Sequence, residues 1–393
     1  MTHNEIMELD NKYIMETYAR YPVVLSHGNN ATLTDVDGTE YIDFTSGIGV
    51  NSLGTADKGW IAAVTEQINK IAHISNYFYS PVTTKLAEML INLSDMKRVF
   101  FGNSGAEANE GAIKVARKYS YDKYGEGRSV IISLNQSFHG RTITTLAATG
   151  QDAFHTHFHP FTEGFKYIPL NDTEALKSAV TPDVCGIIVE PIQGEGGVNI
   201  MDCEYAKQLK EICEANDILL IFDEIQTGCG RTGKMFTYEY FEFLPDVLTL
   251  AKGLGGGLPI GAFLCGKKCE HVLGASQHGT TFGSNPVAAA GAVEVLTRLT
   301  QCGFLDEVNK KGQYIMNTVK EMNVPFIKEI RGSGLIIGMQ IDGIPKDYTK
   351  KAVANGLLLL TAGTDVIRLL PPLTITYHEI DKGLSILKEV FAK

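Results

Sequence analysis

The sequence lacks the features that mark several large classes of protein. No apolar run among its 393 residues is long enough to span a bilayer, and residues 1–10 are polar, without the apolar core of a signal peptide. Lysine and arginine form no block, and the formal net charge is −10. That charge argues against nucleic acid or a membrane as the main partner, so we expect neither.

Cysteine is also sparse. The seven cysteines are scattered, odd in number and without CxxC spacing, which argues against a disulfide framework or a zinc site of paired cysteines. We therefore expect reduced thiols in a cytoplasmic protein. The remaining composition, with 44% hydrophobic and 20% charged residues, is typical of a globular chain, and the length allows two domains with substantial cores.

Strand-like and helical patterns alternate through the middle of the chain. The expected strands are residues 98–101, 129–134, 186–190, 218–222 and 261–265. This alternation predicts an α/β fold with a mostly parallel sheet covered by helices. After about residue 290 the pattern changes to mixed strand and helix. We therefore expect a segment 1–45 that joins a small domain, a large domain 46–290, and a small C-terminal α+β domain 291–393.

Polar clusters follow several of these strands, at residues 103–104, 135–141, 193–195 and 223–226. The carboxyl ends of strands in an open α/β sheet meet at one edge, so we expect the clusters to converge on a site. Ser104 and Glu107 predict a capping box at a helix start, where Gly105 and Ala106 leave backbone N–H groups open to a phosphate. A capped helix that binds nothing is the alternative.

Four further residues carry candidate chemistry. Phe138 suits stacking on a flat heteroaromatic ring and Arg141 suits a carboxylate, although a core phenylalanine and a surface ion pair fit the local sequence equally well. Asp223 follows an apolar run and is placed to pair with a protonated ring nitrogen. Lys252 precedes a glycine-rich segment. A partly desolvated lysine there can form a Schiff base, and a solvated lysine before a mobile loop is the alternative.

Other motifs are incomplete. Residues 228–234 fit a phosphate-binding loop but lack the serine or threonine that binds magnesium. Residues 34–40 predict a hairpin turn and resemble a calcium loop without its distal glutamate. His155, His157 and His159 would face one side of a strand, as metal ligands do, but no other ligand set lies near them in the sequence. We expect a surface loop there and no metal site.

Five motifs taken together resemble, in order and spacing, the class III pyridoxal-phosphate-dependent aminotransferases. They are SGAEA at 104–108, SFHGRT at 137–142, FDEIQTG at 222–228, AKG at 251–253 and GTTFG at 279–283. The resemblance covers essentially the whole chain and is greatest to the members that act on N2-acetyl-L-ornithine. It implies a fold-type-I transferase, in which a large domain with a mostly parallel sheet of the seven-stranded type between helices is joined to a smaller α+β domain. Residues 53–58 lack the histidines of the family pattern.

The resemblance also implies a set of site residues. Lys252 would hold pyridoxal 5′-phosphate as a Schiff base and carry a proton, and Asp223 would keep the ring nitrogen protonated. Phe138 would stack on the ring, and Gln226 would lie near its phenolic oxygen. The other implied cofactor contacts are Ser104, Gly105, Ala106, Glu224, Ile225 and, from the second subunit of a homodimer, Thr281. The implied substrate contacts are Arg141, Thr280 across the same interface, Arg368 for a carboxylate of glutamate or 2-oxoglutarate, and Glu195, which would cover Arg368 when the other substrate binds.

The activity that this resemblance implies is transfer of the terminal amino group of N2-acetyl-L-ornithine to 2-oxoglutarate by a ping-pong route, in arginine biosynthesis. Ornithine, succinylornithine, N-succinyl-diaminopimelate and 4-aminobutyrate remain open as amino donors. A lyase or racemase on the same fold is a more distant alternative, because Arg368 and Glu195 indicate two alternating substrates. The remaining alternative is a protein that binds no cofactor.

Overall fold

The computed structural model of the chain describes residues 1–392. Its largest sheet has seven strands. In the order in which they lie, they are β4 (Arg98–Gly102), β12 (Gly261–Cys265), β11 (Val247–Leu250), β10 (Leu219–Asp223), β7 (Val184–Val189), β5 (Val130–Leu134) and β6 (Phe165–Ile168). Six of these strands run in the same direction, and β12 runs opposite to them. The predicted α/β fold with a mostly parallel sheet is therefore confirmed.

Helices cover both faces of this sheet. Alternate side chains of β10 point to opposite sides: Leu220 and Phe222 join one hydrophobic cluster, and Leu219 and Ile221 join another. The first cluster includes residues of α8 (Cys203–Ala215), and the second includes residues of α5 (Gly105–Tyr124). Because central strands covered on both faces have no polar side, β7, β10, β11 and β12 are buried at every residue.

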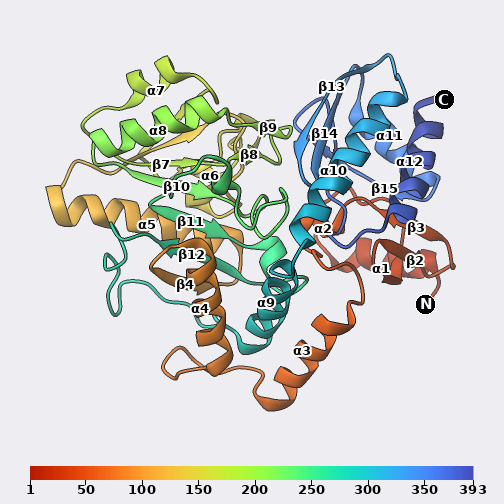
Figure 1. Ribbon diagram of the computed structural model, residues 1–393, viewed down its shortest axis with the longest axis horizontal. Coiled ribbons are helices and arrows are strands. Elements are labelled where there is room, and N and C mark those ends of the chain that lie inside the picture. The colour runs from red at the N-terminus through yellow and green to blue at the C-terminus, as the bar shows by residue number, and fades with distance from the viewer. Residues whose placement is uncertain (393) are drawn as a thin grey trace.

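A second unit is built on a four-stranded antiparallel sheet. Its strands are β13 (Ile327–Ser333), β14 (Ile336–Ile341), β17 (Val366–Leu369) and β16 (Leu360–Ala362), and its helices are α10 (Phe304–Glu321), α11 (Pro345–Ala354) and α12 (Tyr377–Ala392). Beside it lies the N-terminal sheet of β1 (Leu25–Asn29), β2 (Thr32–Asp35) and β3 (Glu40–Asp43), which β15 (Leu357–Leu358) completes by parallel pairing with β3. Figure 1 shows these N-terminal strands next to the C-terminal helices.

The antiparallel pairing of β2 with β3 confirms the predicted hairpin. The predicted boundaries at residues 45 and 290 stay a prediction, and α9 (Pro286–Leu299) runs without a break through the second of them. The other elements are α1 (His3–Tyr13), α2 (Ser46–Gly49), α3 (Lys58–Lys70), α4 (Pro81–Ser94), α6 (Ile143–Ala148), α7 (Thr173–Ala179), β8 (Ile192–Gln193), β9 (Asn199–Ile200) and three 3-10 turns, η1 (Asp152–Phe154), η2 (Thr237–Tyr240) and η3 (Lys252–Leu254).

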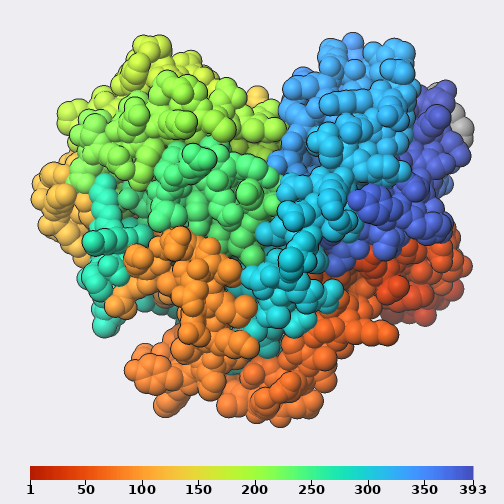
Figure 2. All heavy atoms as spheres, viewed as in Figure 1, coloured from red at the N-terminus to blue at the C-terminus, as the bar shows by residue number. Residues whose placement is uncertain are grey.

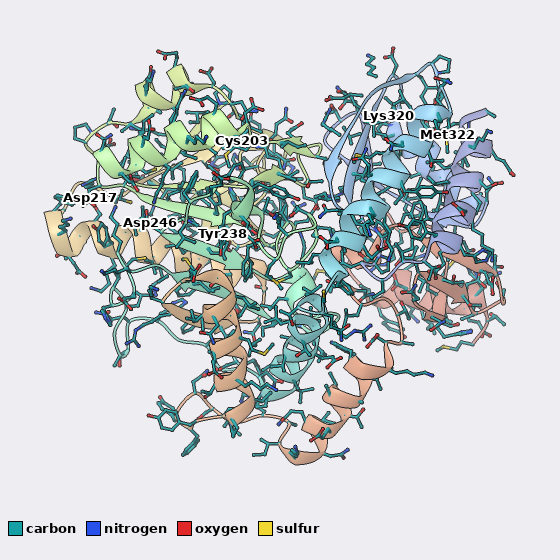
Figure 3. The ribbon with its side chains drawn as sticks, viewed as in Figure 1. Cys203, Asp217, Tyr238, Asp246, Lys320 and Met322 are labelled. Atoms are coloured by element: carbon teal, nitrogen blue, oxygen red, sulfur yellow. The ribbon has the colours of Figure 1, made fainter. Side chains whose placement is uncertain are left out.

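No helix within residues 1–392 is both long and apolar enough to cross a membrane. All seven cysteines are free, and Cys203 lies exposed at the start of α8 (Figure 3).

The segment that departs from the family pattern forms the start of α3. Asp57 accepts a hydrogen bond from the Trp60 backbone N–H at 2.9 Å and pairs with Arg298 of α9 at 3.1 Å. The Trp60 indole N–H donates to the Gly255 carbonyl at 3.1 Å. Asp57 thus caps and orients α3, and the single tryptophan of the chain ties this helix to the turn that follows Lys252.

Candidate active site

Lys252 follows β11 at the carboxyl end of the large sheet and begins the turn η3. Its φ of +42° lies in the left-handed region, which a residue with a side chain adopts only where the surrounding structure holds it. Burial lowers the pKa of its ammonium group, although Glu195, Asp223 and Glu190 favour the charged form. A neutral amine is therefore more accessible here than at an ordinary surface lysine.

Asp223 is the last residue of the neighbouring strand β10 and is 3% exposed. Its Oδ2 atom accepts hydrogen bonds from His139 Nδ1 and Asn109 Nδ2, both at 2.7 Å, and its Oδ1 accepts one from the Ile225 backbone N–H at 3.0 Å. Asn109 is itself fixed, since its Oδ1 accepts from Thr249 at 2.8 Å. These donors hold the carboxylate in one orientation.

The N-terminus of α5 points into the same region. Ser104 caps the helix by accepting from the Glu107 backbone N–H at 3.2 Å. The predicted capping box is only half formed, because the Glu107 carboxylate accepts from the Asn103 backbone N–H instead of that of Ser104. A Cβ atom at Gly105 would lie 2.8 Å from an Ile225 methyl carbon, so glycine allows the helix start to approach closely. Open N–H groups and the helix dipole favour an anion here.

These elements surround a cavity of about 430 Å³, which is within the usual range for a small-molecule site. The predicted residues that line it together are Ser104, Gly105, Ala106, Phe138, Arg141, Asp223, Ile225, Gln226 and Lys252. They lie at or after the carboxyl ends of β4, β5, β10 and β11. The predicted convergence at the carboxyl ends of the strands is therefore confirmed.

Arg368, on β17 of the small unit, reaches the edge of this site and is 2% exposed. Its Nη1 lies 2.9 Å from Glu195 Oε1 and donates to Gln226 Oε1 at 2.9 Å, and its Nη2 donates to Glu195 Oε2 at 3.1 Å. Burial acts to raise the pKa of Glu195, but Arg368 and Lys252 hold it below its ordinary value. The Gln226 amide, predicted near a phenolic oxygen, is engaged by Arg368 and Glu195.

Glu224, Thr280 and Thr281 do not line the cavity. The Glu224 carboxylate accepts from the backbone N–H groups of Thr237 and Tyr238 at 2.6 and 2.7 Å, since neighbouring residues at the end of a strand point to opposite faces. Its predicted contact with a cofactor finds no support in this position. Thr280 accepts from Asn103 Nδ2 at 3.2 Å within the same chain, and Thr281 is exposed to solvent.

Two residues of the site, Asn109 and Glu190, were not predicted from the sequence, and His139 was predicted only as a member of the motif at 137–142, without its contact with Asp223. Glu190 follows β7, lines the cavity and accepts from the Phe138 backbone N–H at 2.9 Å. Burial raises its pKa to about 7. An acidic residue at the end of an apolar strand was the signal that identified Asp223, and it applies equally to Glu190. Asn109 is a buried polar residue on the apolar face of α5, and its place among the apolar residues of that helix is the signal that could have identified it.

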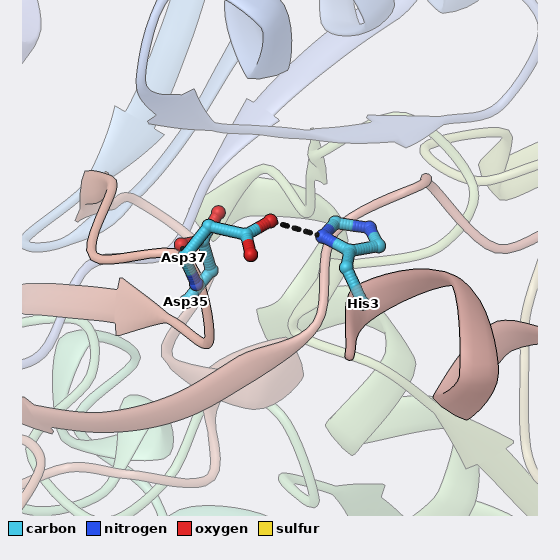
Figure 4. Close-up of side chains that lie close together, drawn as sticks. All are labelled: His3, Asp35 and Asp37. Carbon is cyan, nitrogen blue, oxygen red and sulfur yellow. Dashed lines mark hydrogen bonds and ion pairs between the residues drawn. The ribbon is translucent and has the colours of Figure 1, made fainter. Parts of the chain in front are cut away.

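One group of metal-ligand type lies within residues 1–392, and it is remote from the cavity in the fold. His3 of α1 bonds to Asp37 at 2.9 Å beside Asp35, in the turn between β2 and β3 (Figure 4). The Asp35 carboxylate already accepts from the backbone N–H groups of Asp37 and Thr39 and from the Tyr41 hydroxyl. This hydrogen-bonded cluster fastens α1 to the hairpin without need of an ion.

Comparison with known proteins agrees with this geometry. The family model for class-III aminotransferases matches residues 13–391. The chain belongs to the class-III aminotransferase family. A relative from Haemophilus ducreyi, named acetylornithine aminotransferase, is 52% identical to this aminotransferase over 100% of both chains.

Two solved structures have the same fold. One is an ornithine aminotransferase from Toxoplasma gondii, described with partial occupancy of PLP at its active site, with a TM-score of 0.95, 36% identity, and coverage of 99% of this aminotransferase and 94% of that chain. The other is the N-acetylornithine aminotransferase from Stenotrophomonas maltophilia K279a, with a TM-score of 0.85, 37% identity and 98% coverage of both chains.

The residues of the cavity fit pyridoxal 5′-phosphate by their own chemistry. An amine with a lowered pKa suits its aldehyde, a fixed carboxylate suits its ring nitrogen, and a half-buried phenylalanine ring suits its face. The open helix start at Gly105 and Ala106 suits its phosphate. All four groups line one cavity of this aminotransferase.

Proposed function

We propose that this aminotransferase moves the terminal amino group of N2-acetyl-L-ornithine to 2-oxoglutarate, giving N-acetyl-L-glutamate 5-semialdehyde and L-glutamate. The name of the relative at 52% identity supports this donor, and we infer a place in arginine biosynthesis in the cytoplasm. The observation that carries the proposal is that, of two arginines near Lys252, one is paired with a carboxylate and the other is not. Arg141 lies exposed at the cavity with no ion pair within residues 1–392, whereas Arg368 is covered by Glu195.

Two differently charged substrates fit this arrangement. The donor has one carboxylate, remote from its reacting amine, and Arg141 suits it. Because Glu195 neutralises the charge of Arg368, the uncharged part of the donor would lie against an ion pair and not against an unpaired guanidinium. The acceptor has two carboxylates, of which one would displace Glu195 from Arg368 and the other would reach Arg141.

Bound pyridoxal phosphate would supply a ring that accepts electrons and so stabilises the charge left on a carbon that loses its proton. Asp223, held by His139 and Asn109, would keep a proton on the ring nitrogen. The Lys252 amine would take the proton from the terminal carbon of the donor, and the lowered pKa of this group favours the neutral form that this requires.

We further infer a homodimer, in which Thr280 and Thr281 lie at the contact between subunits. Large apolar side chains are exposed beside them: Tyr77, Phe78 and Tyr79 are 95%, 71% and 100% exposed, and Phe282 is 62% exposed. Phe282 packs against His73 at 5.4 Å between ring centroids, and the side chain of Asn76, which directly precedes Tyr77, donates to the Thr280 carbonyl at 3.1 Å, so the two segments lie side by side. The segment that follows α3 projects from the lower edge of the molecule in Figures 1 and 2. Such a surface is typical of an interface.

A donor panel with 2-oxoglutarate tests the function. We expect kcat/KM for N2-acetyl-L-ornithine to exceed that for ornithine, succinylornithine, N-succinyl-diaminopimelate and 4-aminobutyrate by roughly tenfold or more, an amount equal to about 1.4 kcal/mol of binding in the transition state. A preference for unacylated ornithine would contradict the proposed donor and agree with the Toxoplasma gondii neighbour. Turnover without any keto acid would indicate a lyase or racemase.

A further inference from the structure

We propose that Phe154 positions the guanidinium of Arg141 and thereby makes the enzyme select substrates by their carboxylate. Phe154 is the last residue of the turn η1. The inference rests on the proposed function, because it concerns how Arg141 binds the carboxylate of the amino donor.

The contact between the two side chains is close. Arg141 Cζ lies 3.9 Å from the centroid of the Phe154 ring and 5.3 Å from that of Phe138. The two rings are 6.2 Å apart and nearly perpendicular, at 82°. Phe138 lines the cavity that contains Lys252, and Phe154 lines a neighbouring polar cavity. The guanidinium therefore lies against one ring of the active site and one ring from outside it.

This aromatic contact is what orients Arg141. Its guanidinium forms no hydrogen bond and no ion pair with any group of residues 1–392, and its side chain is exposed to solvent. An aromatic ring attracts a guanidinium through its face and leaves the N–H groups at the edge of the plane free. Those N–H groups are the ones that bind a carboxylate in a two-pronged arrangement. Phe154 thus restricts a long, flexible cation without competing for its donors.

The turn that carries Phe154 is tied to the loop that carries Phe138. The Phe154 backbone N–H donates to the Gln151 carbonyl at 3.0 Å. The Gln151 side chain in turn donates to the carbonyl of Ser137 at 3.0 Å. Since Ser137 directly precedes Phe138, both rings are fixed to one backbone framework. Phe154 consequently has a defined position relative to the active site.

The test compares two amines that differ only in the carboxylate: N2-acetyl-L-ornithine and N-acetylputrescine. The first half-reaction of the holoenzyme is followed by the absorbance of the cofactor, for the wild type and for Phe154→Leu, Phe154→Ala and Phe154→Tyr. Leucine keeps an apolar side chain of similar bulk without a ring face, and tyrosine keeps the ring. Thermal unfolding of each variant reports whether it folds.

We expect Phe154→Leu and Phe154→Ala to lower kcat/KM for N2-acetyl-L-ornithine by about three- to fivefold, the size of a cation–π contact at an exposed site, mainly through a higher KM. The value for N-acetylputrescine should change by less than about twofold, because that amine has no carboxylate for Arg141 to bind. Phe154→Tyr should resemble the wild type. In an Arg141→Gln background the loss caused by Phe154→Leu should disappear.

Equal losses with both amines, an undiminished loss in the Arg141→Gln background, or no loss in Phe154→Leu would each overturn the inference. Failure of the proposed function gives a different result, since the wild type itself would then not use N2-acetyl-L-ornithine. In that case the same comparison, made with the donor that the panel identifies and its counterpart lacking the carboxylate, decides the role of Phe154.

Discussion

Replacing Glu195 with glutamine should shift the preference of the enzyme from the monocarboxylate donor toward glutamate. Glu195 and Arg368 approach to 2.9 Å, so their charges are about 4 Å apart and attract by about 4 kcal/mol at an effective dielectric constant of ~20. The Glu195 side chain is 28% exposed, and part of this attraction is lost to solvent. We expect a net change of about 1.5 to 3 kcal/mol, which is roughly a 10- to 100-fold change in the ratio of rate constants.

The assay measures single-turnover rates of the first half-reaction, separately for N2-acetyl-L-ornithine and glutamate. In Glu195→Gln the charge of Arg368 is no longer neutralised, so Arg368 should bind a carboxylate of glutamate more readily. N2-acetyl-L-ornithine would then bind next to an unneutralised cation. We therefore expect the kcat/KM for N2-acetyl-L-ornithine, divided by that for glutamate, to fall. Glu329→Gln serves as the control, because it removes another partner of an arginine, Arg331 of β13, outside the active-site cavity. A ratio that changes by less than about twofold in Glu195→Gln would refute the role given to this pair.

Other predictions concern the proton on the cofactor ring, the stability at different pH and the backbone at Lys252. Asp223→Asn should lower kcat by about 10²- to 10⁴-fold, because the amide keeps the shape but not the charge of the carboxylate; a smaller loss would contradict its role. Burial raises the pKa of Glu190 from 4.5 to about 7, so the folded state holds this proton more tightly. The group therefore favours folding below about pH 4.5, and this contribution to the free energy of unfolding is lost as the pH rises through about 7. The Tm of Glu190→Gln should therefore fall less steeply than that of the wild type between about pH 5 and about pH 8, and equal slopes of Tm against pH would argue against this. Lys252→Gly should be more stable to urea than Lys252→Ala by about 1 kcal/mol, because φ at this position is +42°; equal midpoints would show that the backbone is not strained there.

Much of the fold follows from local patterns. The apolar run at 261–265 became β12, because a central strand covered by helices admits few polar residues. The run at 98–101 became the edge strand β4, in which Arg98 is exposed. The antiparallel direction of β12 could not be predicted, since it depends on which strands it lies between. The pairing of β15 with β3 was equally inaccessible, because it joins residues more than 300 positions apart through two short strands that have little pattern of their own.

The site was predictable where its chemistry depends on residue type and position relative to a strand, as for Asp223 and Lys252. It was not predictable where side-chain direction decides. Asp223 and Glu224 are neighbours, yet one lines the cavity and the other accepts from the backbone of η2. Gln226 likewise turned out to bridge Arg368 and Glu195, a contact between units far apart in the sequence.

The proposed chemistry requires that Lys252 is the residue that holds the cofactor. Reduction of the holoenzyme with borohydride followed by mass spectrometry of its peptides tests this in one measurement. We predict a single pyridoxyl phosphate group on the peptide that contains Lys252, and none on the corresponding peptide of Lys252→Ala. Label on another lysine, or a reduced holoenzyme in which Lys252 is unmodified, would contradict the role of Lys252 as the residue that binds the cofactor.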